Sequence, residues 1–524
     1  MRLDRPTQVS LLPFLLVNVI GAVAVVLARP FERIATPLSA VVLLGAVVTA
    51  LLIRPDDVVA IGGSGIATTD YLRLFLVLAS VVGLLLAFVG TAATDDRQLP
   101  VVTAVTATVL ATSAMTLALP DARLAVLAAT AGGAFGACLA IAPARSRLGA
   151  TAGTRALRAA VVAGTLAVAA TAWIGRDLGD LAAQPVVFGL AYLAVALAAA
   201  IRFGAIPFHA WPARLTDAAP ETALPLVTAL SPAAFAIVAL AWADASIAPL
   251  LVDLDSARAV VLAIAIASIL LASLAAFIQD DVEHIVGYAI IGDAGVVMLA
   301  VAALDPESWA PARIWILALI VTRSAFAAWA AATRSEFQSG RVDDLRGWAV
   351  RSPLLAGTFA LVALASLGLP GLAAFDARSS LVSLSLDGPL AWIVLLGTLT
   401  PAAYYGRLLL VGLDRAGGRA EPRTWRPTFE PLDLTDLPGW AGRSWAANRG
   451  VGAASGAIVL ALLAVAVSIG GFGGPEAAAG LPPTLDGATE SFAPDGPVAP
   501  DGIDPETGLP SSPDGIPDVI EPTP

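Results

Sequence analysis

About fourteen apolar runs, each close to the length of a membrane span, dominate this sequence. In lipid, every backbone polar group must find its hydrogen-bond partner within the protein, so each run is predicted to be a helix. With 58% apolar and 14% charged residues, the chain is predicted to be an all-α polytopic membrane protein rather than a soluble enzyme. The runs lie near residues 9–28, 37–53, 72–93, 100–119, 123–143, 156–174, 184–208, 222–243, 258–278, 284–304, 312–332, 353–375, 389–411 and 451–472.

Arginine is distributed unevenly between the predicted loops. The odd-numbered loops hold most of the loop arginines, including Arg147 after the fifth run and Arg341 after the eleventh. The even-numbered loops are poor in arginine and often acidic, as at Asp253 and Asp305. Because cytoplasmic loops carry an excess of basic residues, we expect the odd loops in the cytoplasm and both termini outside the cell membrane.

The C-terminal part of the chain changes character abruptly. Residues 1–472 are predicted to form one transmembrane bundle, in which 412–450 is the longest cytoplasmic loop. Residues 473–524 are rich in Pro, Gly and Asp, which is typical of a disordered acidic tail. The net charge of −11 comes largely from this tail, so it is no argument about nucleic acid, and no nucleic-acid partner is expected.

The sequence offers little material for an active site. It has two histidines, one cysteine (Cys138) and neither a dinucleotide fingerprint nor iron–sulfur spacing. We therefore expect no cofactor, no metal site and no active site belonging to this chain alone.

The segment Ile201–Pro220, IRFGAIPFHAWPARLTDAAP, interrupts a predicted span with groups that are costly in lipid. Arg202 lies well inside the apolar stretch, and Pro207 and His209 follow within eight residues. Charged and helix-breaking residues persist at such depth where they face protein or water, so this segment is predicted to serve a transport pathway.

Two further landmarks follow in order. The first is QDDVEHIVGY at residues 279–288, and the second is RSPLLA at 351–356 with SLGLP at 366–370 and Phe375. With the opening segment and YYGR at 404–407, these motifs resemble the antiporter-like membrane subunits of respiratory complex I and of multi-subunit sodium/proton antiporters. The similarity covers roughly residues 184–410 and is greatest to the N-type subunit of NADH-quinone oxidoreductase, with the D-type antiporter subunit next.

This resemblance implies a particular architecture. Two inverted five-helix repeats are expected, with an antiporter-like core over about residues 72–410 and with helices 7 and 12 broken at the membrane midplane. Pro207 and Pro370 stand where those breaks are expected. A broken helix exposes unpaired carbonyl and amide groups, which hold water and ions where a continuous helix could not. The implied partners are other membrane subunits, the lipid bilayer, and protons or Na⁺.

The sequence departs from the family at the titratable positions. The resemblance implies a glutamate in helix 5, lysines in helices 7 and 8, and a lysine or glutamate in helix 12, but this chain contains no lysine. Arg202, Pro232 and Arg378 stand at the three later positions, and helix 5 has no acid. The loop pair that is Lys-Arg in the family is Glu283-His284 here.

Arginine cannot simply replace lysine as a proton carrier. Its pKa would have to fall by about 5 units to reach neutrality, which requires roughly 7 kcal/mol. Arg202 and Arg378 are therefore predicted to act as fixed positive charges that order water or hold a carboxylate. A biased composition accounts for arginine in the loops, but it does not account for Pro232 or for the acid-free helix 5.

Two titratable groups remain as candidates, each with two interpretations. Asp293 in helix 10 is either a proton carrier or an acid paired with Arg202, Arg323 or Arg378. His209 either shuttles protons or caps carbonyl groups of the broken helix 7.

Other charged residues near these positions carry simpler expectations. Arg323 in helix 11 loosely matches another basic site of the family. Asp376 is expected to pair with Arg378, because isolated charges are costly near the break. Asp217 and Glu221 flank the start of helix 8 and are expected to be solvated.

These observations favour a proton- or cation-translocating membrane subunit of a complex I-like or antiporter complex. That function predicts that Asp293, His209 and Arg202 line one hydrated path. The alternative is a non-conducting structural or assembly subunit, in which apolar packing fills the gaps at Pro232 and in helix 5. If the parent complex is an NADH-quinone oxidoreductase-type translocase, its redox chemistry belongs to other subunits.

Overall fold

The computed structural model describes residues 9–55, 57–61, 64–93, 98–142, 146–174, 185–247, 254–414 and 449–471. The predicted tail, 473–524, lies outside these residues, as does all of the predicted loop 412–450 except its first three and last two residues.

The described chain is almost entirely helical, with one short antiparallel hairpin of β1 and β2. The elements are α1 (Leu12–Ala28), α2 (Glu32–Leu52), β1 (Val58–Ile61), β2 (Ser64–Ala67), α3 (Asp70–Ala93), α4 (Leu99–Ala118), α5 (Ala122–Ile141), α6 (Arg147–Ile174), α7 (Pro185–Phe203), α8 (Ala210–Leu215), the π-helix η4 (Leu226–Leu230), α9 (Ser231–Ser246), α10 (Asp255–Ile278), α11 (Val282–Ala303), η6 (Pro306–Ser308), α12 (Trp309–Phe337), η7 (Val342–Leu345), α13 (Trp348–Arg351), α14 (Pro353–Leu367), α15 (Ala373–Ser385), α16 (Gly388–Gly397), α17 (Pro401–Leu413) and α19 (Arg449–Ser468).

The prediction of an all-α polytopic membrane protein is confirmed. Within the described residues, 12 helical segments are long and apolar enough to cross a membrane. Two shorter apolar helices, α1 and α14, coincide with the first and twelfth predicted runs. Every predicted run thus contains a helix, while fourteen membrane crossings and the inverted repeats stay predictions.

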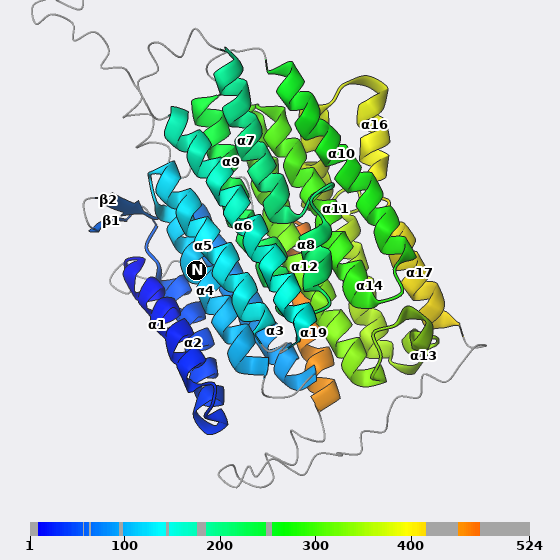
Figure 1. Cartoon of the computed structure of the whole chain (residues 1–524). Coiled ribbons are helices and arrows are strands. Elements are labelled where there is room, and N and C mark those ends of the chain that lie inside the picture. The colour runs from blue at the N-terminus through cyan, green and yellow to red at the C-terminus, as the bar shows by residue number, and fades with distance from the viewer. Residues whose placement is uncertain are drawn as a thin grey trace, which may run out of the picture.

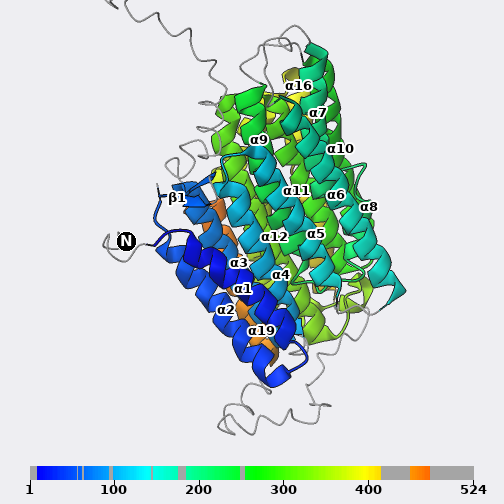
Figure 2. The ribbon, with the colours of Figure 1, turned by 60° about the vertical axis from the view of Figure 1, so that its left-hand side comes forward.

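The helices run side by side in one elongated bundle (Figure 1). α1 and α2 lie on one flank and α16 and α17 on the other, and α19 returns to pack against α3, α12 and α14. The turned view shows the same flank of α1 and α2 beside α3 and α4 (Figure 2). The η4–α9 segment and α12 are the most deeply enclosed spans, with 100% and 94% of their apolar windows buried. Polar groups on these two segments are therefore shielded from lipid.

The chain leaves the helical conformation at both predicted breaks. The break in predicted helix 7 lies between α7 and α8, and the break in predicted helix 12 lies between α14 and α15. α7 ends at Phe203, and Gly204 takes a positive φ of 65° before Pro207 and the short α8. α14 ends at Leu367, and Gly368 takes a positive φ of 51° before Pro370 and α15. Glycine has no Cβ to oppose this conformation, and proline cannot continue the hydrogen-bond ladder, so the two residue types together end each helix.

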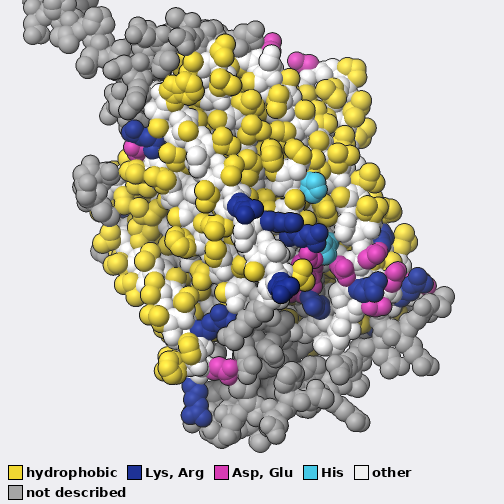
Figure 3. Space-filling view, in the orientation of Figure 1, with side chains coloured by type: hydrophobic (Ala, Val, Ile, Leu, Met, Phe, Trp, Pro, Cys, Tyr) yellow, Lys and Arg dark blue, Asp and Glu magenta, His cyan; other side chains and the backbone are white. Residues whose placement is uncertain are grey.

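Charged side chains gather toward one end of the visible face, whereas the opposite part of that face is mostly hydrophobic (Figure 3). The segments after α7, before α11 and after α12 meet at this end. Asp281 forms a β-bridge with Arg341, and His284 contacts Asp217 at 3.1 Å. These three segments, which the sequence analysis assigned to odd-numbered loops, therefore lie at the same end of the bundle.

Candidate functional site

Arg202 lies in the last turn of α7, in the interior of the first half of the bundle. Its side chain is 3% exposed, and its Nη2 donates to the Ala129 carbonyl of α5 at 3.3 Å and to Ser231 Oγ of α9 at 2.8 Å. Its Nε has no hydrogen-bond partner among the described residues. Because arginine stays protonated even when it is buried, this group is a fixed positive charge held between three helices.

A glycine in α5 makes room for this guanidinium. A Cβ added at Gly133 would lie 1.5 Å from Arg202 Nη1, so no other residue fits there without moving the arginine. The region where the resemblance implies an acid–lysine pair is thus occupied by arginine packed directly on the α5 backbone. The space beside α5, where the resemblance implies an acid, is filled by the charged guanidinium of Arg202 and not by apolar packing.

Predicted helix 8, which consists of η4 and α9 in the structure, is irregular in a way that the sequence did not reveal. Leu226–Leu230 forms the π-helical turn η4, and Ser231 begins α9 immediately afterwards. π-Helical turns are often found at functional sites. Pro232 follows without a polar side chain, and Ser231 supplies the hydroxyl that Arg202 bonds.

Asp293 of α11 and Arg323 of α12 form a buried pair in the second half of the bundle. Arg323 Nη2 donates to Asp293 Oδ1 at 2.7 Å, and Nε donates to Oδ2. The arginine side chain is 0% exposed and the aspartate side chain 9%. Of the three arginines considered from the sequence, Arg323 is therefore the direct partner of Asp293.

Two tyrosines of α17 complete the surroundings of Arg323. Its Nη1 donates to Tyr405 Oη at 3.0 Å and to Tyr404 Oη at 3.3 Å. The tyrosine rings pack against Phe326 of α12, with centroids 5.2 Å away for Tyr405 and 6.3 Å for Tyr404. The YYGR motif marked this helix in the sequence, but the role of its tyrosines as acceptors for Arg323 was not foreseen.

A small cavity opens beside Asp293 and reaches Arg378. It admits about one water molecule. Its walls come from α10, α11, α12, α15, α16 and the start of α17, and they include Asp293, Arg378, Ser273, Trp315 and Thr398. Two charged groups and two hydroxyls give a water here the several polar partners that it needs. This cavity links the Asp293–Arg323 pair to Arg378 beside the break between α14 and α15.

Arg378 of α15 binds two carbonyl groups at the end of α14 and a third between α16 and α17. Its Nη2 donates to the carbonyls of Leu367 at 2.8 Å and Gly368 at 3.0 Å, and its Nη1 donates to that of Thr398 at 3.3 Å. The last carbonyls of a helix carry partial negative charge, so a buried cation is favourable at the end of α14.

The predicted ion pair between Asp376 and Arg378 is not formed. Asp376 is exposed, whereas Arg378 is 1% exposed and faces the backbone carbonyls. Residues two apart on a helix point to nearly opposite sides, which explains why the pair does not form.

His209 directly precedes α8, after the break that ends α7. No hydrogen bond from its side chain caps that helix, its Nδ1 is buried without a partner among the described residues, and its ring centroid lies 6.3 Å from that of Tyr288 in α11. No contact in the described part of the chain joins His209 or Arg202 to Asp293. The structure thus brings Asp293, Arg323 and Arg378 together, and it leaves Arg202 and His209 in separate surroundings.

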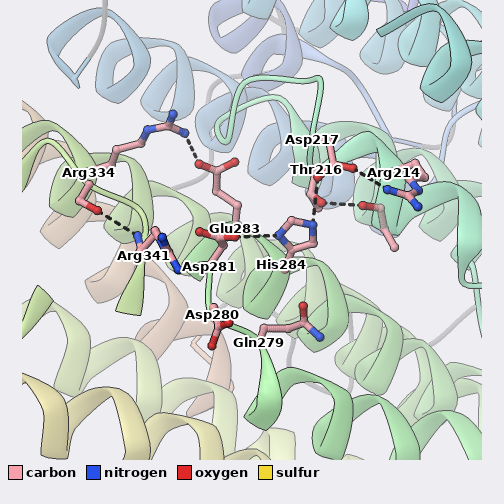
Figure 4. A network of polar contacts seen from close by, with 12 residues as sticks. Arg214, Thr216, Asp217, Gln279, Asp280, Asp281, Glu283, His284, Arg334 and Arg341 are labelled. Atoms are coloured by element: carbon pink, nitrogen blue, oxygen red, sulfur yellow. Dashed lines mark hydrogen bonds and ion pairs between the residues drawn. The ribbon is translucent and has the colours of Figure 1, made fainter. Parts of the chain in front are cut away.

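A second group of charged residues lies where α8, the start of α11 and the end of α12 meet (Figure 4). His284 Nε2 contacts Asp217 Oδ1 at 3.1 Å, and Arg334 Nη1 donates to Glu221 Oε1 at 2.5 Å and to Glu283 Oε1. Glu221 is only 7% exposed, so the expectation that it is solvated is wrong. We call Asp217, Glu221, Glu283, His284 and Arg334 the end cluster. Its sequence signal was the Glu283-His284 pair, which departs from the family.

Across the described residues, no group of three or more His, Cys, Asp or Glu side chains is arranged to hold a metal ion.

The middle of the chain is similar to known proteins. Residues 163–402 match the family described as NADH:quinone oxidoreductase/Mrp antiporter, TM. Subunit N of NADH-quinone oxidoreductase from Halorhodospira halophila is 30% identical over 243 residues, which are 45% of this chain and 49% of that protein. Subunit N from Thiobacillus denitrificans is 28% identical over 254 residues, 47% of this chain and 51% of that protein. The chain thus spans about half the length of these relatives.

Solved structures extend the likeness of the fold to nearly the whole chain. A chain of respiratory complex I from Thermus thermophilus has a TM-score of 0.66 at 19% identity, covering 91% of this chain and 99% of that one. A chain of the Mrp complex from Dietzia sp. has a TM-score of 0.66 at 18% identity, with coverage of 92% and 97%. A chain of the archaeal membrane-bound sulfane sulfur reductase also scores 0.66, at 17% identity. The resemblance seen in the motifs is confirmed: this is a multi-pass membrane protein with the fold of the antiporter-like subunits, and the middle of its sequence is similar to subunit N of NADH-quinone oxidoreductase.

Proposed function

We propose that this chain is a proton- or cation-translocating membrane subunit of a multi-subunit complex related to complex I or the Mrp antiporter. One observation carries the proposal. A buried carboxylate, Asp293, is paired with a buried arginine and opens on a small polar cavity that reaches the broken helix 12. A charged pair costs several kcal/mol per ion to remove from solvent, so a purely structural bundle has little use for one at this depth.

Asp293 is the proton carrier in this proposal. A carboxylate can accept a proton, whereas the guanidinium groups of Arg323 and Arg378 stay charged over the physiological range. Asp293 loads from a water in the cavity when its pairing with Arg323 weakens, and it releases the proton when the pair closes again. The hydroxyls of Tyr404 and Tyr405 hold Arg323 in place while the carboxylate is neutral.

Arg202 has a different role. It lies in the first half of the bundle, bonded to a backbone carbonyl and a serine, and no acid of the described segments forms an ion pair with it. We assign it a fixed charge that repels cations from a direct path through α5, α7 and α9. His209 is assigned to the aqueous side of the helix 7 break, and Asp376 to the outer surface.

The molecular setting follows from the same homology. The core of about residues 72–410 is proposed to lie in the plasma membrane, with both termini outside and the segment 412–450 in the cytoplasm. Its partners are proposed to be the other membrane subunits of the complex and the lipid bilayer. Large apolar side chains exposed on α1, α2, α6 and α10 provide surfaces for both.

The test is proton flux through the purified complex in liposomes that contain a pH-sensitive dye. Asp293→Asn keeps the size of the side chain but removes its charge and its capacity to carry a proton. Asp376→Asn makes the same chemical change at an exposed position on α15 and serves as the matched control. The proposal predicts loss of flux in the first variant and wild-type flux in the second. Full flux in Asp293→Asn would instead support the non-conducting alternative, which the buried pair and its cavity do not favour.

A further inference from the structure

The end cluster contains two carboxyl groups that share one cation. Glu221 and Glu283 both contact the same atom, Nη1 of Arg334. Glu221 comes from the segment before η4, Glu283 from the first turn of α11, and Arg334 from the last turn of α12. Three parts of the chain far apart in sequence therefore converge on a single guanidinium nitrogen.

The shared cation also brings the two carboxyl groups close to each other. Oε1 of Glu221 and Oε1 of Glu283 both lie against Nη1 of Arg334, and Glu221 is only 7% exposed. An ionised carboxylate can only accept hydrogen bonds, so a bond between two carboxyl groups requires a proton on one of them. One proton within the pair would therefore replace a like-charge contact by a hydrogen bond.

The surrounding charges favour that proton. Asp281 adds a third negative charge near Glu283, while Arg341 is exposed at the surface. On the other side of Glu283, His284 faces Asp217 at 3.1 Å and Asp281 at 4.0 Å, and Arg214 faces Asp217 at 3.4 Å. Among the described residues, the cation in direct contact with the pair is Arg334, whose side chain is half exposed. Two carboxylates held this close together resist ionising at the same time, which favours a proton on one of them.

We propose that Glu221 and Glu283 hold one exchangeable proton between them and form the proton-loading site at this end of the bundle. The proton comes from water at the partly exposed side of Glu283 and binds a carboxylate oxygen, and the second carboxylate accepts the resulting O–H bond. The site's role in loading rests on the proposed transport function, whereas the proton itself can be detected without transport.

The test is infrared difference spectroscopy of the full-length protein in lipid, titrated across neutral pH. A protonated carboxyl group gives a C=O stretch that disappears on ionisation and shifts in D₂O. The wild type is expected to lose one such band as the pH rises. Glu283→Gln and Glu221→Gln are each expected to remove it, and Glu336→Gln, on the same last turn of α12 but outside the pair, is expected to keep it. Arg334→Gln is expected to move the loss of the band to higher pH, because the balancing charge is gone.

Two results would overturn the inference. One is a wild-type protein without a titrating carboxyl band, and the other is a band that survives in both glutamine variants. The same variants measured for flux in the complex separate the two proposals. If the wild type shows the band but no proton flux, the proton site stands and its role in transport falls. If it shows flux but no band, the transport proposal stands and the proton site falls.

Discussion

The buried pair of Asp293 and Arg323 makes the sharpest stability prediction. Each residue is almost wholly enclosed, so replacing either one strands the other's charge. Breaking a buried pair by removing one partner costs about 3–5 kcal/mol. An unpaired charge at the centre of a bilayer costs about 2.5–3.5 kcal/mol on insertion scales, which agrees with the lower part of that range. Asp293→Leu and Arg323→Met are each expected to lower the free energy of unfolding by about 3–5 kcal/mol.

The double variant separates the pair from its surroundings. Apolar residues of similar volume at both positions remove both charges, leaving only the lost hydrogen bonds to Tyr404 and Tyr405. At about 1 kcal/mol for each bond, the double variant is expected to be destabilised by about 2 kcal/mol or less. Two single losses of at least 3 kcal/mol then imply a coupling energy of about 4 kcal/mol or more.

The assay is unfolding of the purified protein in mixed micelles with increasing SDS, followed by tryptophan fluorescence and circular dichroism. Trp315 donates its indole N–H to the Asp293 carbonyl at 3.2 Å, so the fluorescence includes a reporter next to the pair. Single variants within about 0.5 kcal/mol of the wild type, or effects that simply add in the double variant, would show that the two charges are not coupled as a buried pair.

Three further substitutions test the packing that positions the centres, each measured by the same unfolding assay. Gly133→Ala is expected to cost about 1–3 kcal/mol, because its Cβ meets the Arg202 guanidinium, and adding Arg202→Ala should relieve that cost. Arg378→Met is expected to cost about 1–3 kcal/mol, because two carbonyls at the break between α14 and α15 and the Thr398 carbonyl lose their donor; an unchanged stability would show that water replaces the arginine. Gly295→Ala places a Cβ 2.8 Å from a backbone oxygen of α10 and is expected to cost about 1–3 kcal/mol, whereas the control Gly292→Ala makes only ordinary contacts and should stay within about 0.5 kcal/mol.

The apolar runs and the motifs predicted the helices and their breaks well. A span must be a helix because lipid offers the backbone no hydrogen bonds, and length and composition alone reveal it. Pro207 and Pro370 marked the breaks because proline and the nearby glycines act locally. The motifs also indicated the fold, and the comparisons confirm it.

The partners of the charged side chains were harder to predict, because they depend on contacts between distant segments. Glu221 is buried against Arg334, which lies 113 residues away, and no local sequence pattern predicts that contact. The guanidinium of Arg202 rests on Gly133, a residue that only close helix packing gives a role. The Asp376–Arg378 pair, by contrast, could have been rejected from helical geometry alone, since the two positions face different sides of one helix.

Proton transport through Asp293 requires that the cavity between Asp293 and Arg378 be hydrated. A high-resolution cryo-electron microscopy map of the protein in a lipid nanodisc would show this, because an ordered water there has fixed polar partners. Water density is expected within hydrogen-bond distance of the Asp293 carboxylate. A dry cavity, with every oxygen of Asp293 satisfied by Arg323 alone, would contradict the claim that this buried charge serves proton transport.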